Sequence, residues 1–140
     1  MVIDTSAMIA CLFDEPERIS FIDAIDGAKA KLISVVSFVE ASFVILGKKG
    51  EDGIADLARF IGRARIENVP VDADQAELAV EAFRRFGKGR HPARLNIGDC
   101  FAYALARSDG PAALVQRRRF RAHRYRRRVT TARSFKRRRV

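Results

Sequence analysis

Three carboxylates far apart in the sequence stand where the neighbouring residues predict burial. Asp4 ends an apolar opening segment, Glu40 lies inside an apolar stretch, and Asp99 stands near the start of a late helical pattern. An ionised carboxylate in apolar surroundings is costly unless a cation or hydrogen-bond donors compensate its charge. We therefore expect the fold to gather the three acids around a metal ion, which would make the protein a hydrolase of phosphate esters.

The ions that suit such a cluster are hard divalent cations. Mg²⁺ and Mn²⁺ prefer oxygen ligands, often one or two carboxylates completed by water. Carboxylates gathered without a cation repel one another, and their pKa values rise. A bound cation removes that cost, lowers the pKa of a water molecule and stabilises charge that develops on a phosphoryl group.

Each acid also has a structural explanation. Asp4 could cap the helix that follows it. Glu40 could reach solvent or pair with a lysine, although most of its neighbours are apolar. Asp99 could simply favour the positive end of its helix. One acid alone is weak support for a metal site, and the three together are more specific.

The elements that must position these acids alternate between short strands and helices. This order favours an α/β sandwich around a parallel sheet. In such folds sites form beyond the carboxyl ends of strands, which is where Asp4 stands. We predict strands at 2–3, 31–34, 66–71 and 113–115, and helices at 7–13, 15–28, 37–46, 51–65, 72–86 and 96–107. In this prediction Thr5 and Ser6 precede the first helix, Ser37 caps the third, and Gly47 ends it.

The charge of the chain is unevenly distributed. The 140 residues carry a net charge of +10, but residues 117–140 hold 13 of the 27 Lys and Arg residues and none of the 17 acids. The preceding 116 residues therefore carry a net charge of −3. A basic run of this kind usually indicates nucleic-acid binding or disorder.

The remaining composition favours a cytoplasmic protein that does not enter a membrane. Cys11 and Cys100 lie among apolar residues, and we expect two buried reduced thiols. No His and Cys spacing suggests zinc. The opening residues lack the basic region of a signal peptide. The longest apolar stretch, 32–46, contains polar residues and is too short to span a bilayer.

Three segments of the chain carry a likeness to a known family. Residues 2–7 (Val-Ile-Asp-Thr-Ser-Ala), 37–41 (Ser-Phe-Val-Glu-Ala) and 95–104 (Leu-Asn-Ile-Gly-Asp-Cys-Phe-Ala-Tyr-Ala) resemble PIN-domain ribonucleases. The strongest likeness is to the VapC-type toxins of bacterial toxin–antitoxin pairs. It covers about residues 1–115, and its most specific part is the late Asn-x-Gly-Asp-Cys segment.

This resemblance implies a PIN-like three-layer sandwich, with a short central parallel sheet flanked by helices, as a nuclease domain at residues 1–116. It implies an endoribonuclease that uses Mg²⁺ or Mn²⁺ and leaves a 5′-phosphate and a 3′-hydroxyl. The partners would be an RNA substrate, a cognate antitoxin and a second copy of the chain. By resemblance, the metal ligands and catalytic residues are Asp4, Glu40 and Asp99; Thr5 or Ser6 would donate hydrogen bonds to this cluster, and Asn96 would support the start of the helix that carries Asp99.

The loop at 87–94 is a weaker candidate for substrate contact. It is rich in glycine and basic residues, and it lacks the spacing of a phosphate-binding P-loop. Lys88, Arg90 and His91 could contact RNA phosphates. A solvated loop explains them equally well, and His91 is more typical of a surface residue than of a general base.

The end of the chain departs from the family. Such proteins usually continue with a short Gly-x-Asp-Phe-like turn that supplies a fourth acid, whereas residues 116–126 are rich in arginine and contain no acid. We hypothesise a shifted reading frame, because codons compatible with residues 114–127, read one base later, give Trp-Phe-Lys-Gly-Asp-Asp-Phe-Ala-His-Thr-Asp-Ile-Ala. A genuine basic tail that binds RNA or is disordered is the alternative.

This departure leaves two rival functions open. The first is a catalytically impaired or dead toxin remnant that still binds its antitoxin. The second is a non-enzymatic protein that binds nucleic acid through residues 117–140. From about residue 117 we expect an atypical, poorly ordered segment.

Overall fold

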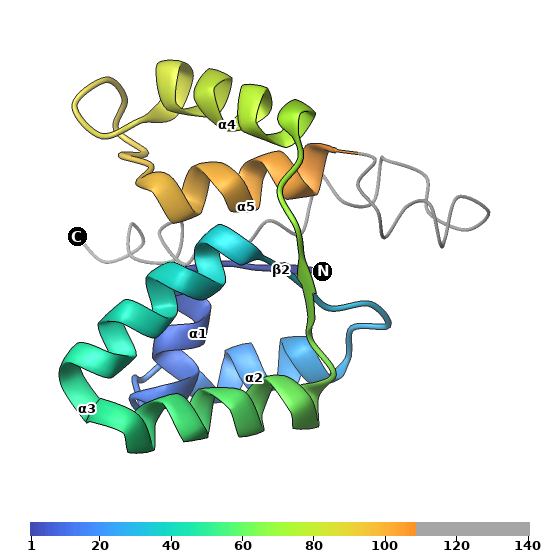
Figure 1. Cartoon of the computed structure of the whole chain (residues 1–140), viewed down its shortest axis with the longest axis vertical. Coiled ribbons are helices and arrows are strands. Elements are labelled where there is room, and N and C mark those ends of the chain that lie inside the picture. Colours follow the sequence, from blue (N-terminus) through green and yellow to red (C-terminus); the bar gives the residue numbers. More distant parts are fainter. Residues whose placement is uncertain (109–140) are drawn as a thin grey trace.

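The computed structural model describes residues 1–108 of the chain. The predicted strand at 113–115 and the Arg-rich segment at 117–140 lie outside the described residues. Figure 1 shows helices on both sides of a small sheet. In chain order the elements are β1 (Val2–Ile3), α1 (Thr5–Leu12), α2 (Arg18–Asp26), β2 (Leu32–Ser34), α3 (Val35–Ala64), β3 (Glu67–Val69), α4 (Ala73–Phe86) and α5 (Ile97–Arg107).

The described strands form one parallel sheet in the order β1-β2-β3. Val2 pairs with Leu32 and Ile3 with Ile33 in the first ladder, and β3 pairs with the other side of β2. The strands are only two or three residues long. Their side chains are nevertheless buried throughout β1 and β2, because helices cover both faces. The predicted α/β sandwich with a short parallel sheet is confirmed.

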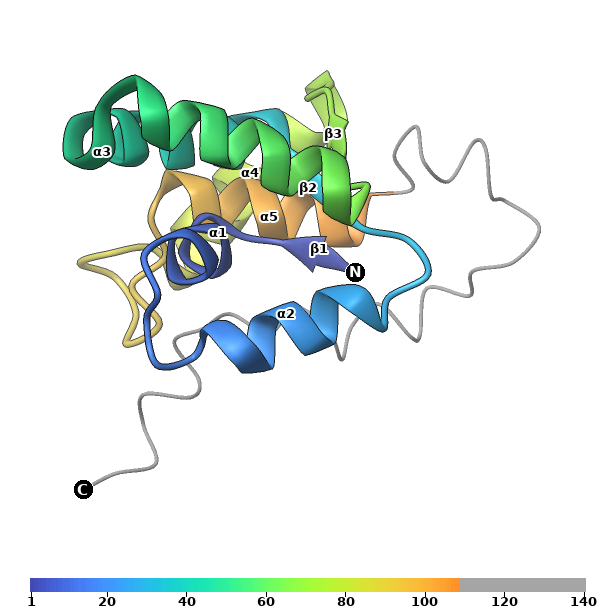
Figure 2. The same cartoon turned by 90° about the horizontal axis from the view of Figure 1, so that it is seen from below.

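Alternation along the strands separates the two helical layers. Successive side chains of a strand point to opposite faces of the sheet. Val2 and Leu32 pack against α5, in a cluster with Ala102 and Leu105. Ile3 and the equivalent isoleucine of β2 face the other way, into the core formed with α1, α2 and α3. Figure 2 shows this second layer from another side.

Helix α4 packs against α5 rather than against the sheet. Small and medium apolar side chains line this contact, among them Ala79, Ala82 and Ala104. Alanine allows the two helix backbones to approach closely, since little side-chain volume separates them. The α4–α5 pair therefore fixes the position of the first turn of α5, where Asn96 and Asp99 lie.

The predicted division of the third helical region is wrong in detail. Helix α3 begins at Val35 with Ser34 as its cap, not Ser37, and it continues through Gly47. The break comes at Gly50, whose φ of 62° and ψ of −154° interrupt the helix. Gly47 is exposed and helical, so its weak helix propensity alone does not end the helix. In the same way Asp4 caps α1, and Thr5 and Ser6 fall inside that helix.

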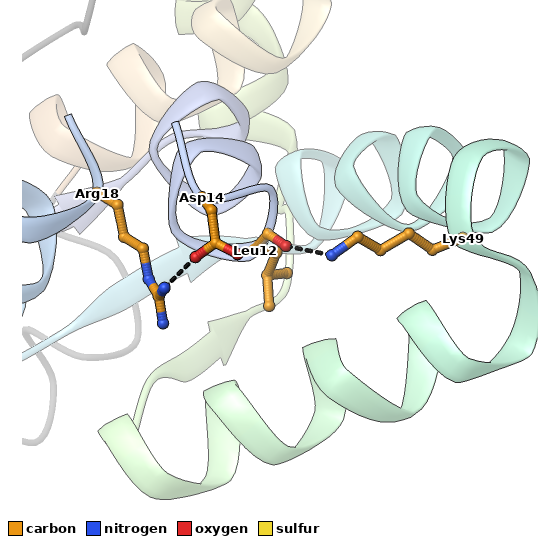
Figure 3. Close-up of polar contacts among 4 residues, drawn as sticks. All are labelled: Leu12, Asp14, Arg18 and Lys49. Atoms are coloured by element: carbon orange, nitrogen blue, oxygen red, sulfur yellow. Dashed lines mark hydrogen bonds and ion pairs between the residues drawn. The ribbon is translucent and has the colours of Figure 1, made fainter. Parts of the chain in front are cut away.

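The break in α3 lies against the carboxyl end of α1. Lys49 donates a hydrogen bond to the backbone carbonyl of Leu12, as Figure 3 shows beside the Arg18–Asp14 ion pair. A cation at the carboxyl end of a helix is favourable because its last carbonyls carry partial negative charge. The Nζ atom of Lys49 also lies 4.7 Å from the centre of the Phe13 ring.

Two further expectations can be compared with the described residues. Cys11 and Cys100 are both buried and unpaired, as predicted. In residues 1–108, no helix combines the length and the apolar character needed to cross a membrane.

We expect Gly47 and Gly50 of α3 to respond in opposite ways to replacement by alanine. Gly50→Ala should lower the free energy of unfolding by about 1–3 kcal/mol, because the backbone conformation at Gly50 is essentially restricted to glycine. Gly47→Ala should raise it by up to about 1 kcal/mol, because its position is helical and open. Urea denaturation of both variants measures this, and equal effects at the two positions would contradict the assignment of the break.

Candidate functional site

Asp4 lies at the carboxyl end of β1 and caps α1. Its Oδ1 accepts a hydrogen bond from the Ala7 amide at 2.8 Å and another from the Ser6 hydroxyl at 2.9 Å. Only 5% of its surface is exposed. Burial is the main cause that raises the pKa of Asp4 above its ordinary value of 3.8; the bonds from Ala7 and Ser6 oppose this, and the negative charge of Asp99 raises it further. The fold therefore brings Asp4 and Asp99 close enough to repel.

Asp99 is held in the first turn of α5 by a reciprocal pair of hydrogen bonds. The Asn96 side chain accepts from the Asp99 amide at 2.8 Å, and Oδ2 of Asp99 accepts from the Asn96 amide at 2.9 Å. This arrangement is a capping box, which satisfies two backbone amides at the start of a helix. Asp99 is 6% exposed. Asn96 thus supports the helix start that carries Asp99, while its part in metal binding stays a prediction.

Glu40 points from the first half of α3 toward the start of α1. Its Oε2 accepts a hydrogen bond from the Thr5 hydroxyl, with the two oxygens 2.5 Å apart. The Thr5 oxygen also lies 3.4 Å from the carbonyl of Ser37. A hydroxyl carries one proton, so the shorter contact with the carboxylate is the stronger bond. Thr5 and Ser6 are therefore donors to two of the predicted acids.

Ser37 and Gly98 lie beside Glu40 and Thr5, and the sequence analysis assigned neither of them to the site. The buried Ser37 hydroxyl donates to the carbonyl of Gly98 at 3.2 Å. A β-carbon placed on Gly98 would lie 1.9 Å from Oε2 of Glu40 and 2.6 Å from the Thr5 hydroxyl oxygen. A polar residue within an apolar helical stretch and a glycine beside Asp99 were the signals available in the sequence.

The three acids accept hydrogen bonds from described residues. Oδ1 of Asp4, Oε2 of Glu40 and Oδ2 of Asp99 each accept a hydrogen bond from a neighbouring residue. The ion pairs in this part of the chain involve none of the three acids. They are exposed helical pairs: Arg18–Asp14, Arg59–Asp56 and Arg85–Glu81.

The three acids do not form a single tight cluster as they stand. Within residues 1–108, no three His, Cys, Asp or Glu side chains form a group that could hold a metal ion. The charge of Asp99 is one of the causes that raise the pKa of Asp4, and Glu40 contacts Thr5 and lies against Gly98. Because Mg²⁺ is often held by one or two carboxylates and several waters, the Asp4–Asp99 pair is a suitable donor set. The three-acid ligand set remains a prediction.

The basic loop at 87–94 is closed by backbone hydrogen bonds between its two ends, and it leads directly into Asn96. The Lys88 amide donates to the Leu95 carbonyl at 3.0 Å, and the Leu95 amide donates to the Phe86 carbonyl at 2.9 Å. Lys88, Arg90 and His91 are exposed. The Nδ1 atom of His91 accepts from a backbone amide within the loop at 3.0 Å, and its ring packs edge-on against Phe86. These contacts hold His91 within the loop.

Comparison with known proteins identifies a family and several relatives that the chain resembles. The model of the PIN domain matches residues 1–123. Ribonuclease VapC30 of Mycobacterium tuberculosis is 45% identical over 116 residues, which cover 83% of this chain and 88% of that protein. Ribonuclease VapC of Mycolicibacterium smegmatis is 46% identical over 121 residues, covering 86% and 94%. Ribonuclease VapC28 of M. tuberculosis is 39% identical over 107 residues, covering 76% and 80%.

The family model spans the whole described fold, including the segments that carry Asp4, Glu40 and Asp99. The family agrees with the α/β fold and its short parallel sheet. The chain therefore belongs to the PIN-domain family and, within it, to the VapC proteins.

Proposed function

We propose that the protein is a toxin-type ribonuclease that depends on Mg²⁺ or Mn²⁺ and hydrolyses RNA phosphodiester bonds. The ribonuclease names of relatives up to 46% identical support the activity. The observation that carries the proposal is the burial of two carboxylates, Asp4 at the carboxyl end of β1 and Asp99 in the first turn of α5, the charge of Asp99 being one cause that raises the pKa of Asp4. Two such charges are costly together without a cation, and a divalent ion offsets that cost.

The residues around the acids suit a metal ion. Asp4 and Asp99 would hold it through their carboxylate oxygens, and Glu40 would face it from α3. Ser6 and Asn96 fix the orientation of the two aspartates, as supporting hydrogen bonds do around metal ligands. When bound, the ion would lower the pKa of a water molecule and stabilise charge on a phosphoryl oxygen.

One feature of the sequence favours a second candidate, an inactive toxin remnant. Residues 116–126 contain no acid where the family pattern supplies a fourth carboxylate. Arginines near a metal site repel the cation and weaken its binding. In that case the protein would still fold and bind an antitoxin without cleaving RNA.

The proposal includes two protein partners, a cognate antitoxin and a second copy of the chain. Both come from the resemblance to the family. The first half of α3 carries exposed apolar side chains at Val39, Phe43 and Leu46, three to four residues apart and so on one side of the helix. Apolar side chains in such a row are the kind of surface that a homodimer covers.

We further propose that the basic loop contacts the RNA backbone and that the protein acts in the cytoplasm. Lys88 and Arg90 are exposed, and the loop ends at the residue that caps the Asp99 helix. Exposed cations beside a cleavage site attract phosphates and position the strand. The two buried, unpaired cysteines fit a reducing compartment.

Neutralising either central aspartate should abolish metal-dependent cleavage. Asp4→Asn and Asp99→Asn should each lower Mn²⁺-dependent RNA hydrolysis by about 100-fold or more, because each removes a charged oxygen ligand. Asp72→Asn is the matched control, since Asp72 caps α4 through the Gln75 amide, as Asp4 caps α1 through Ala7. Cleavage is followed on a labelled RNA, and Mn²⁺ binding by calorimetry.

Two results would overturn this assignment in different ways. A wild-type protein that binds Mn²⁺ but leaves RNA intact would identify the inactive remnant. Aspartate variants that match the wild type in both binding and cleavage would show that the Asp4–Asp99 pair is not the site.

Without metal, Asp4→Asn should stabilise the protein near neutral pH. The raised pKa of Asp4 means that the folded state binds its proton more tightly than the unfolded state does. Stability is therefore lost as the pH rises from the unfolded value toward the folded one, and the asparagine variant escapes that loss. We expect a higher midpoint of urea unfolding for Asp4→Asn at pH 7 in chelator, and a difference that disappears below about pH 4. A less stable variant at pH 7 would show that the charge of Asp4 is already compensated in the protein.

Removing the charges of the basic loop should weaken RNA binding in a salt-dependent way. The double variant Lys88→Gln/Arg90→Gln should bind a cleavage-resistant RNA less tightly, and the slope of log affinity against log salt should fall by about 0.7 for each phosphate that the variant no longer neutralises. Arg63→Gln, at an exposed position in the last turn of α3, is the control. If the loop variant keeps the wild-type affinity and slope, the RNA is bound elsewhere, with residues 117–140 as the first candidate.

A further inference from the structure

Gly98 occupies a helical position where its own backbone does not require glycine. It is the second residue of α5 and is buried. Among the described residues, the glycines with positive φ are Gly50 and Gly89, so Gly98 adopts a conformation open to any residue. Glycine weakens a helix relative to alanine because it has more conformational freedom to lose on folding. The reason for glycine at position 98 therefore lies in its surroundings.

Those surroundings leave no room for a side chain. The β-carbon of an alanine at position 98 would lie 1.9 Å from Oε2 and 3.0 Å from Cδ of Glu40. It would also lie 2.6 Å from the hydroxyl oxygen of Thr5. Gly47 and Gly62, which are also helical, have nothing within 4 Å of the same position. The space beside Gly98 is filled specifically by the carboxylate of Glu40 and the hydroxyl that holds it.

Two hydrogen bonds fix this arrangement from opposite sides. Thr5, on α1, donates to Oε2 of Glu40 at 2.5 Å. Ser37, one turn before Glu40 on α3, donates to the carbonyl of Gly98 at 3.2 Å. The carboxylate of Glu40 is thus set against the residue that immediately precedes Asp99. Helix α3 and the first turn of α5 are held together at the same point.

We propose that Gly98 is a positioning residue: by having no side chain, it lets the Glu40 carboxylate, held by Thr5, lie against the residue before Asp99, from where it would face a divalent cation held by Asp4 and Asp99. The inference rests on the proposed metal-dependent function. It adds that access of Glu40 to the site is set by the volume at position 98. In this account Ser37 keeps the first turn of α5 at the distance that this contact needs.

The test is Mn²⁺ binding by the purified full-length chain, measured by calorimetry in the absence of RNA. Gly98→Ala should weaken binding about 10- to 100-fold, the range found when groups that orient metal ligands are removed. Its thermal stability without metal should not fall by a comparable amount, since the atom displaced first is the end of a flexible glutamate and alanine favours the helix. Gly47→Ala is the control and should bind Mn²⁺ like the wild type.

A double-mutant cycle separates positioning of Glu40 from a general disturbance. In the Glu40→Ala background, the step from glycine to alanine at position 98 should have no further effect on Mn²⁺ affinity, because the side chain that it displaces is gone. If the two substitutions weaken binding additively, Gly98 does not act through Glu40 and the inference is wrong.

A second pair of variants covers the case in which Gly98→Ala does not fold. Thr5→Val removes the hydroxyl and keeps the shape of the side chain, whereas Thr5→Ser keeps the hydroxyl. Weaker Mn²⁺ binding by the valine variant, with recovery in the serine variant, supports the placement of Glu40 by this contact. Wild-type affinity in Thr5→Val overturns it.

The outcomes for the two proposals differ. A wild-type chain that binds no Mn²⁺ overturns the metal-dependent function, and this inference with it. A wild-type chain that binds Mn²⁺, loses it in Asp4→Asn and keeps it in Gly98→Ala overturns the positioning role alone.

Discussion

The burial of Asp4 and Asp99 is the constraint on which the candidate site depends. Two buried negative charges are held near one another by elements that come from opposite ends of the described chain. Such an arrangement persists only when the surrounding fold is stable enough to bear its cost. Here the parallel sheet fixes Asp4, and the α4–α5 pair fixes Asp99, so neither aspartate can move away without disturbing a packed core.

Capping and site chemistry are combined in the same side chains. Asp4 caps α1, and Asp99 forms a reciprocal capping box with Asn96. In the sequence, the capping explanation and the metal explanation stood as alternatives for these two acids. The two explanations do not exclude each other, because Oδ1 of Asp4 and Oδ2 of Asp99 accept the capping bonds and each carboxylate has a second oxygen. A cap that fixes a carboxylate also prepares it to bind a ligand, since its orientation is already set.

The sequence predicted most of the helices and strands, but it did not predict the contacts between them. Apolar segments predicted the parallel sheet, and the likeness of three segments predicted the family. The helix break was placed at Gly47 instead of Gly50, because propensity does not reveal which glycine adopts an unusual backbone conformation. The part played by Gly98 was missed for a similar reason: the space around a residue depends on side chains that approach from other helices. The roles of Asp4, Glu40 and Asp99 as metal ligands, and that of residues 117–140, stay predictions.

Helix α1 is bonded to α3 near both of its ends within the described part of the chain. Its first residues hold the acidic site, and its last carbonyls receive Lys49 from the turn of chain around Gly50. Eight residues of helix span about 12 Å, a rod too short to bend appreciably. The contacts of Thr5 and Lys49 join the same two helices, so a shift of α3 along α1 would strain both contacts together.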